Sequence, residues 1–531
     1  GFAALAASSW SAVRSQNSDV RIGVDRTGYL ARGGIEMAIQ RLNRAIGQMV
    51  VEDIPSEDPL DPPLVWSFDI DANGNGQIDG WETVTCNVSR ADVDTQTKTN
   101  DDGSYNFYQQ YLIVADGVTD ADAPVQVRAV AELETTPIVQ FFAFSGEAME
   151  LCSPPAFMSS PLAFLDDFSG RVHANGNMYI SPTSTHTNFD VTSLHSAGDI
   201  YRYRLENGVS NNGPVDVRVQ GTSDFEAWPN TFDHDSDTWV SESQELFGGT
   251  VKDSAHGVLP FETPTVGSLA VGGTFHDMAT VGGITIEGNQ VFYQGANITA
   301  LLPTDIGGES TISSESVADV REGVYVDVVN VRMDLLRQYF VDNNLAFNGM
   351  IHCYRGDSDP DQPNGYKFEG GTELFGEGLT VASYNPVYIH GDWNNTNKIP
   401  SAVIADAVNL LSNSWNGTKV LGIAKPVAVE TTYNLAVIAG DTPSQEGAFG
   451  GGMENLLRLH ESWLGKDCNF SGSLVSLFPS QIGKGAFHPN NVFIAPNRKW
   501  NFDTSFNEVG GLPPGCPLIS RVHRVIQTGP Q

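Results

Sequence analysis

Basic residues are scarce in this chain of 531 residues, which has 29 Lys and Arg against 64 Asp and Glu and a formal net charge of −35. Nucleic acids and anionic lipids bind proteins through basic surfaces, so the composition argues against both as partners. A strongly acidic protein suits an extracellular setting, where salt and divalent ions screen its self-repulsion. Charged residues make up only 18% of the chain while glycine is frequent, with 54 residues, which is typical of short strands joined by many turns.

The sequence lacks the local motifs of common enzymes. It contains no HExxH, no GxSxG and no phosphate-binding or dinucleotide-binding glycine motif. We therefore expect a protein that is not an enzyme, with no catalytic residues. Apolar runs of the roughly 20 residues that span a bilayer are absent as well. Residues 1–10 read as the tail end of an apolar helix, so we expect membrane contact only through a segment that is missing or truncated ahead of Gly1.

Cysteine is sparse, with five residues at positions 86, 152, 353, 468 and 516. No Cys-x-x-Cys pair occurs, which argues against a thiolate zinc site or a thioredoxin-type redox centre. Disulfides can form in an exported protein. Our preferred pairs are Cys86–Cys152 and Cys468–Cys516, with Cys353 left over, although spacing alone does not determine connectivity.

One acidic stretch matches a calcium-binding loop position by position. Oxygen donors occupy positions 1, 3, 5, 7, 9 and 12 of the loop, namely Asp71, Asn73, Asn75, Gln77, Asp79 and Glu82. Gly76 at position 6 permits the sharp turn, and Glu82 would bind the ion through both carboxylate oxygens. An Asn- and Gly-rich surface turn is the alternative, but chance rarely fills so many constrained positions. We predict a Ca²⁺ site here, and we expect Ile78 to anchor the loop to apolar neighbours.

The surroundings of this loop predict a structural clip and not a sensor. Residues 62–68 enter it as an extended, strand-like run with two prolines, whereas a sensor hand needs a helix on either side. No second loop of equal quality is present for pairing. Acidic clusters at 233–237 and 357–361 lack the glycine and the final glutamate, so we interpret them as solvated turns.

Residues 12–50 carry the only long helical pattern, with apolar side chains recurring every three or four residues. Gly23, Gly28, Gly33 and Gly34 within it each weaken an isolated helix by about 1 kcal/mol, so we expect them to mark close approach to a neighbouring element. Alternating segments at 107–114, 125–133 and 138–144 predict an antiparallel sheet with one buried face.

From about residue 156 the chain consists of short β-runs separated by Gly and Asn. Examples lie at 172–180, 269–273, 284–288, 291–295, 379–382 and 387–391. Such runs are typical of an irregular β-solenoid or a β-sandwich. We expect decorating helices at 331–343, 400–412 and 453–463. The predicted fold class is mainly β with a long N-terminal α-helix, or α+β overall.

Several segments resemble large type IV pilin-like, pilus-assembly proteins of the PilX type. The helix at 11–44, with its Arg-rich polar face and small-residue stripe, is similar to the N-terminal helix of that class. Segments that resemble its β-domain lie at 168–180, 385–392, 400–412, 453–463, 498–503 and 512–517. The chain departs from the family where Leu5 and Ala6 stand in place of a glutamate.

The resemblance implies an exported structural subunit of a cell-surface type IV pilus-like filament, located extracellularly on the outer surface of a bacterium. Its partners would be other copies of itself or other pilins, bound through the helix. We expect three domains: a pilin-like assembly helix over 1–50, an acidic β-domain with the calcium loop over 51–155, and a large β domain over 156–531.

Two alternatives from another class remain open. One is a secreted or tip-displayed carbohydrate-binding or adhesive β-helix protein, in which tryptophans beside asparagine, such as Trp393 and Trp415, would stack on sugars. The other is a polysaccharide lyase, which would need a base such as Lys252, Arg321 or Lys367 in an acidic groove.

Overall fold

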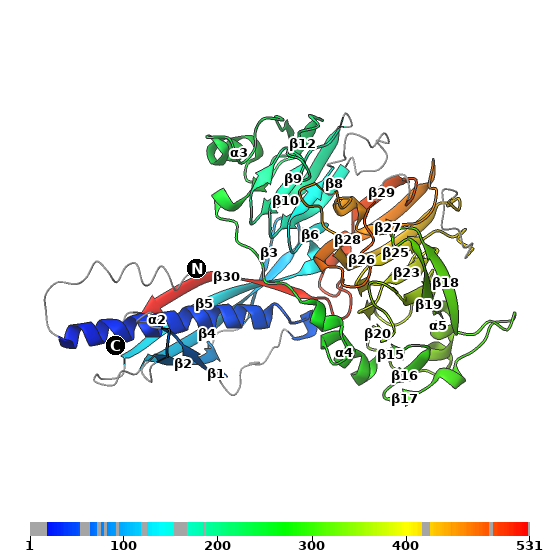
Figure 1. Cartoon of the computed structure of the whole chain (residues 1–531), viewed down its shortest axis with the longest axis horizontal. Coiled ribbons are helices and arrows are strands. Elements are labelled where there is room, and N and C mark those ends of the chain that lie inside the picture. Colours follow the sequence, from blue (N-terminus) through cyan, green and yellow to red (C-terminus); the bar gives the residue numbers. More distant parts are fainter. Residues whose placement is uncertain are drawn as a thin grey trace.

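The protein is mainly β, with a long N-terminal helix and several sheets. The computed structural model describes residues 19–53, 64–71, 76–78, 82–91, 95–117, 125–152, 167–183, 186–416, 425–447, 449–487 and 492–528. Figure 1 shows two parts side by side: helix α2 lies on a small antiparallel sheet, and a larger β region adjoins one end of that sheet.

Helix α2 (Asp19–Ile46) covers most of the helix expected at 12–50, of which residues 12–18 lie outside the described part of the chain. Its buried stripe consists of Leu30, Ala31, Ile35, Ala38, Ile39, Leu42 and Ile46. This stripe packs against the sheet, because the spacing of three and four residues puts these side chains on one face. Among the helices of the described residues, none is long and apolar enough to cross a membrane.

The glycines of α2 differ in how closely a neighbour approaches them. A Cβ atom placed on Gly34 would lie 2.5 Å from Val84 Cγ1, and one on Gly33 would lie 3.2 Å from Ile70 Cδ1. These two glycines therefore mark the close approach expected from the sequence. The same expectation is wrong for Gly28, where an added Cβ would have nothing within 4 Å.

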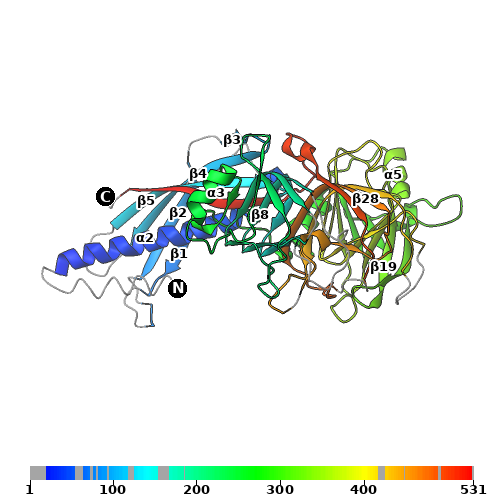
Figure 2. The same cartoon turned by 90° about the horizontal axis from the view of Figure 1, so that it is seen from above.

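The small sheet is antiparallel, with strand order β1-β2-β4-β5-β30 and β3 paired to β4. Its strands are β1 (Leu64–Asp69), β2 (Thr83–Arg90), β3 (Gln96–Thr99), β4 (Tyr105–Gly117), β5 (Val125–Pro137) and β30 (Leu518–Thr528). Buried residues alternate with more exposed ones along β2, β4 and most of β5, as the sequence pattern predicts for a sheet with one covered face. Figure 2 shows α2 running along this sheet.

Strand β30 returns from the far end of the chain to pair with β5. The expected domain boundary at 155/156 therefore does not coincide with the change of sheet. Residues after Pro137 already enter the larger region through β6 (Ala143–Ser145), which pairs with β8 (Asp167–Ala174) and β28 (Asp467–Pro479). The large region is thus an insertion between two neighbouring strands of the small sheet.

In the part of the larger region that the structure describes, the strands form a 15-stranded, a six-stranded and a three-stranded sheet. Its strands, besides β6, β8 and β28, are β7 (Met149–Leu151), β9 (Met178–Ile180), β10 (Thr187–Ser196), β11 (Ile200–Tyr201), β12 (Val215–Arg218), β13 (Phe225–Ala227), β14 (Val251–Lys252), β15 (Ile284–Glu287), β16 (Gln290–Tyr293), β17 (Ala296–Asn297), β18 (Ile312–Asp319), β19 (Val324–Arg332), β20 (Met350–Tyr354), β21 (Gly365–Glu369), β22 (Leu379–Ser383), β23 (Val387–His390), β24 (Ser401–Ala405), β25 (Val408–Leu411), β26 (Thr431–Asp441), β27 (Leu457–Leu459) and β29 (Asn497–Phe502). Its helices are α3 (Trp239–Phe247), α4 (Thr274–Gly282) and α5 (Met333–Asp342).

Successive strands of this region alternate between sheets. From β20 to β28, even-numbered strands join the longest sheet and odd-numbered ones join the six-stranded sheet, always in parallel pairs. From β6 to β12, even-numbered strands join the longest sheet and odd-numbered ones join the three-stranded sheet, again in parallel. Each pass through one sheet is therefore followed by a pass through another.

Two of the three decorating helices expected from the sequence are wrong. Residues 400–412 form strands β24 and β25, and residues 453–463 form a single 3-10 turn followed by β27. Both strands of the first segment are buried along their whole length. Their apolar residues therefore form a continuous run without alternation, which the sequence alone does not distinguish from a buried helix. The helix expected at 331–343 is confirmed as α5. The β-run predicted at 269–273 is also wrong, because residue 269 ends a 3-10 turn (Val266–Leu269) and residues 270–273 form bends and turns.

The expected disulfides are also wrong, because all five cysteines are buried thiols that no disulfide joins. Cys86 packs in the core under α2, whereas Cys152, Cys353, Cys468 and Cys516 belong to the core of the larger region. Burial raises the pKa of the Cys86, Cys468 and Cys516 thiols to about 12. These side chains therefore act as small apolar groups.

A pair of glycine substitutions tests the packing of α2. Gly34→Ala places a methyl group against Val84 and should lower the free energy of unfolding by about 1–2 kcal/mol, because overpacking exceeds the gain in helix propensity. Gly28→Ala is the matched control and should raise it by up to about 1 kcal/mol, since that position has room. Urea unfolding curves give both values, and equal shifts for the two variants would contradict the close contact.

Candidate functional site

The predicted calcium loop joins the antiparallel strands β1 and β2. The last register pair of these strands is Asp69 with Thr83, and the Ile70 amide donates to the Glu82 carbonyl oxygen at 2.8 Å. The loop is therefore flanked by strands, as the run before it predicts, and not by helices. Of the six predicted ligands, Asp71, Gln77 and Glu82 belong to the described residues, whereas Asn73, Asn75 and Asp79 lie outside them.

The described residues place carboxylates at both ends of the loop. Asp71 Oδ2 accepts a hydrogen bond from the Gly76 amide at 2.9 Å, which turns the first carboxylate toward the sixth position. Gly76 has a φ of +78°, a conformation that favours glycine at this turn. Glu82 is completely buried at the opposite end, whereas Asp71 is exposed. The expected anchoring by Ile78 is wrong, because its side chain is 48% exposed.

The two other acidic clusters form hydrogen-bonded turns. Asp233 accepts from the backbone amides of Arg202 and Asp235 at 3.0 and 3.1 Å. In the second cluster, Asp357 binds the Arg355 guanidinium and Asp359 accepts from the amides of the residues that follow it. These carboxylates serve their own loops, which agrees with the interpretation of both clusters as turns.

The side chains considered for sugar binding or lyase chemistry are mostly buried. Trp393 is 0% and Trp415 5% exposed, so neither presents a face for stacking on a sugar. Lys367 is buried and forms ion pairs with Glu315 and Glu369 at 2.6 and 3.1 Å. Buried Arg321 donates to the backbone carbonyls of residues 485 and 455. These groups stabilise the region that contains them.

Asp253 is the centre of a buried polar cluster that no local sequence motif predicts. Its carboxylate accepts from His234 Nδ1 at 2.7 Å, from Trp239 Nε1 at 2.8 Å and from His256 Nδ1 at 2.9 Å. Asp199 Oδ1 lies 3.4 Å from His234 Nδ1, and among the described residues only this Asp199–His234–Asp253 group has the spacing of metal ligands. The donors already satisfy the Asp253 oxygens, so the cluster is explained as a hydrogen-bonded hub.

The same hub contains a chain of contacts that is found in hydrolases. Ser243 Oγ lies 2.8 Å from His256 Nε2, and His256 Nδ1 lies 2.9 Å from Asp253 Oδ1. A serine nucleophile must reach its substrate, but Ser243 lies within α3 and is 0% exposed. This geometry therefore supports packing of α3 and not hydrolysis. The pKa of His234 is raised because the hydrogen bond and charge of Asp253 outweigh the opposing effect of burial.

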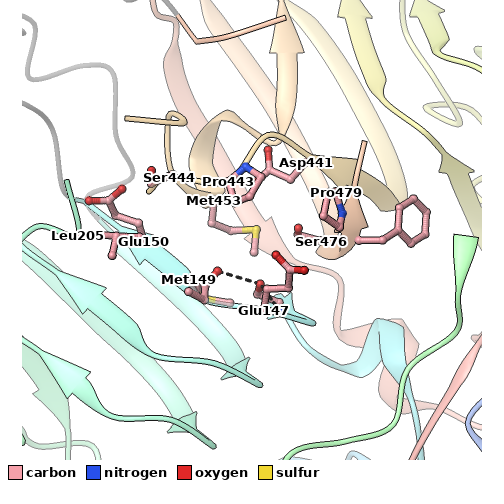
Figure 3. Close-up of a pocket in the computed structure, with 14 residues that line it drawn as sticks. Glu147, Met149, Glu150, Leu205, Asp441, Pro443, Ser444, Met453, Ser476 and Pro479 are labelled. Carbon is pink, nitrogen blue, oxygen red and sulfur yellow. Dashed lines mark hydrogen bonds between the residues drawn. The ribbon is translucent and has the colours of Figure 1, made fainter. Parts of the chain in front are cut away.

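A small cavity beside β7 and the end of β26 contains a buried carboxyl group (Figure 3). The cavity holds about 20 Å³, enough for roughly one water molecule. Figure 3 shows the Glu150 side chain near Leu205 and Ser444, with Met453 between it and the carboxylates of Glu147 and Asp441. These acids do not converge as the ligands of a cation do. Burial, reinforced by the charge of Glu454, raises the pKa of Glu150 to about 7.

Glu150 gives the stability a defined pH dependence. Between about pH 4.5 and 7 the folded protein holds a proton that the unfolded chain has lost, so the free energy of unfolding falls as pH rises and levels off above about 7. Glu150→Gln removes this contribution and should stabilise the protein by up to about 3 kcal/mol at pH 8 relative to pH 4. Urea unfolding at several pH values measures it. Exposed Glu147→Gln is the control, and parallel profiles for both variants would contradict the assignment.

No family model matches this chain, and no curated protein matches it. Among solved structures, the chain is similar to the competence-associated pilin ComZ from Thermus thermophilus, with 11% sequence identity over 97% of this chain and 99% of that chain. The TM-score is 0.23, which is too low to carry an argument about fold or function. This neighbour is a pilin, and the PilX-type resemblance stays a prediction from the sequence.

Proposed function

We propose that the protein is an exported structural subunit of a cell-surface, pilus-like filament, in which α2 mediates assembly. The observation that carries this proposal is the position of α2. One face of the helix is buried on the small sheet, while the opposite face exposes large side chains, with Tyr29 62% and Met37 39% exposed. In Figure 1 the N-terminal part of the helix extends beyond the sheet, away from the larger region.

The charge of the exposed helix face favours contact with another copy of the chain. Arg32, Arg41 and Arg44 are exposed on α2, whereas the chain as a whole has a net charge of −35. A basic helix face on one copy is therefore complementary to the acidic surface of the next. Such complementarity speeds association and selects its orientation.

Calcium is proposed as the stabiliser of the β1–β2 loop. The motif supplies six oxygen donors at the spacing that calcium requires, and the described part of the loop contributes Asp71 held toward Gly76 and a buried Glu82. Binding would stabilise the folded state in proportion to the calcium present, which suits an extracellular protein. No catalytic role is proposed for the ion.

The larger region is proposed as the outward-facing body of the subunit. Its strands alternate between parallel sheets, which supports an irregular β-solenoid. Figure 1 places this region at the end of the small sheet opposite the projecting tip of α2. With α2 in a filament core, the body would stand on the surface.

Charge reversal on the helix tests assembly. The triple variant Arg32→Glu, Arg41→Glu and Arg44→Glu should abolish assembled species, because it replaces attraction to an acidic neighbour by repulsion. The control variant reverses Arg337, Lys466 and Arg524, which lie outside α2, and so makes the same change in net charge. Electron microscopy and sedimentation of the full chain measure assembly, with circular dichroism to establish folding. Loss of assembly in both variants would refute a specific role of the helix.

Chelation tests the calcium loop. Removing calcium with EGTA should lower the melting temperature by several degrees, since saturation at about 100 times Kd stabilises by about 2.7 kcal/mol. Glu82→Gln should weaken calcium binding by at least about tenfold, because one carboxylate is lost from the site. Asp361→Asn, in the second acidic turn, is the control. Calcium titrations that are identical for wild type and Glu82→Gln would show that the loop is only a turn.

A further inference from the structure

A large polar cleft lies where the small sheet meets the larger region. Its volume is about 830 Å³, within the usual range for small-molecule sites, which commonly occur at junctions between domains. One wall comes from β4, β5, β30 and the turn at 99–102, and the other comes from β8, β10 and the turn after β12. These strands meet near the centre of Figure 1.

The floor of the cleft is a polar patch on two parallel strands. Arg171 on β8 is paired in register with Ser193 on β10, and His173 is paired with His195. Residues two positions apart on a strand face the same side of a sheet, so these four side chains share one face. All four line the cleft.

Arg171 is only partly neutralised: burial lowers the pKa of its guanidinium, and the charges of nearby Asp102 and Glu134 oppose this effect. Its guanidinium lies 4.2 Å from the centre of the Phe141 ring and donates one hydrogen bond, from Nη1 to Ser104 Oγ at 3.3 Å. No ion pair to it occurs among the described residues. The nearby carboxylates are engaged elsewhere: Asp102 accepts from Thr192 at 2.7 Å, and Glu134 binds Arg521 at 2.9 and 3.1 Å.

His195 offers a second unmatched group in the same patch. Its Nε2 atom is buried and has no hydrogen-bond partner. Burial lowers the pKa of His195 to about 3, so the ring is neutral at physiological pH. A buried polar atom without a partner costs roughly 1–3 kcal/mol, which a ligand hydroxyl would recover. The neighbouring His173 differs, because its Nε2 already contacts Asn175 Oδ1 at 3.2 Å.

We propose that this cleft binds a small hydroxylated carboxylate of sugar size, of the uronic acid type. Arg171 binds the carboxylate through charge-assisted hydrogen bonds, and His195 Nε2 binds a hydroxyl group. Tyr108, which also lines the cleft and is half-buried, supplies apolar surface for the C–H face of the ring.

This inference goes beyond the filament role and does not depend on it. Assembly requires the exposed face of α2, whereas the cleft lies at the junction of the two parts of the chain. If no ligand binds the cleft, the proposed assembly and calcium binding are unaffected. If the protein does not assemble, the proposed ligand binding is unaffected.

Titration calorimetry of the full chain with galacturonate and glucuronate tests the proposal. Both uronates should bind, and galactose and glucose should bind at least tenfold more weakly because they lack the carboxylate. Tetragalacturonate serves as an additional arm, since tighter binding than the monosaccharide would identify a polymer as the source of the ligand. Equal affinity for charged and neutral sugars, or no binding of either uronate at millimolar concentration, would overturn the proposal.

Substitutions assign the binding to these residues. Arg171→Gln should weaken uronate binding at least tenfold and abolish the preference over neutral sugars. Arg337→Gln, which removes the α5 guanidinium that pairs with Glu373, should change neither. His195→Leu should weaken uronates and neutral sugars alike, because it removes only the acceptor for a hydroxyl. Wild-type affinity in Arg171→Gln would refute the role of the guanidinium. If that variant fails to fold, the wild-type ratio of uronate to neutral-sugar affinity still decides the outcome.

Discussion

The pairing of β30 with β5 is the interaction on which the arrangement of the whole protein depends. Its register runs from Leu518 opposite Pro137 to Thr528 opposite Arg128, and an Arg521–Glu134 ion pair lies within it. The pairing completes the sheet that covers the apolar stripe of α2. It also holds both ends of the larger region against that sheet. The two walls of the cleft, one from each part of the chain, are therefore fixed relative to each other. The packing of α2, the position of the larger region and the shape of the cleft therefore all depend on the pairing of β30 with β5.

Local features of this fold could be predicted from the sequence, and distant pairings could not. The helical period of α2 and the alternation in β4 and β5 depend on residues that are close together in the sequence, so the sequence alone predicts them. The apolar run at 400–412 predicts a helix but forms strands β24 and β25. Strands that are buried on both faces have no alternation of apolar and polar residues, so the sequence pattern does not identify them. The return of β30 to β5 joins residues that are far apart in the sequence, and no local pattern signals it. Cysteine count suggested disulfides, yet each thiol packs as an apolar group.

The candidate sites divide in the same way. The calcium motif is contiguous, and the strand-like run predicted ahead of it is confirmed over residues 64–68, which belong to β1, although Asn73, Asn75 and Asp79 lie outside the described residues. The cleft instead combines residues from β4, β5, β8, β10 and β30, so Arg171 and His195 are unremarkable until the sheets are assembled. Asp253 likewise gains its partners only through folding. A sequence motif can therefore predict a site whose residues lie in one segment. A site that combines residues from several strands can be recognised only once the fold is known.

The insertion of the larger region between two adjacent strands has an architectural consequence. Pro137 and Leu518 face each other across the ladder, so the chain leaves and re-enters the small sheet at a single point. A short turn between these two positions would complete a β-hairpin and leave the helix-bearing unit intact. The larger region is thus an exchangeable module: the unit of α2 and the small sheet can carry insertions of different size and chemistry without any change in its own strand order.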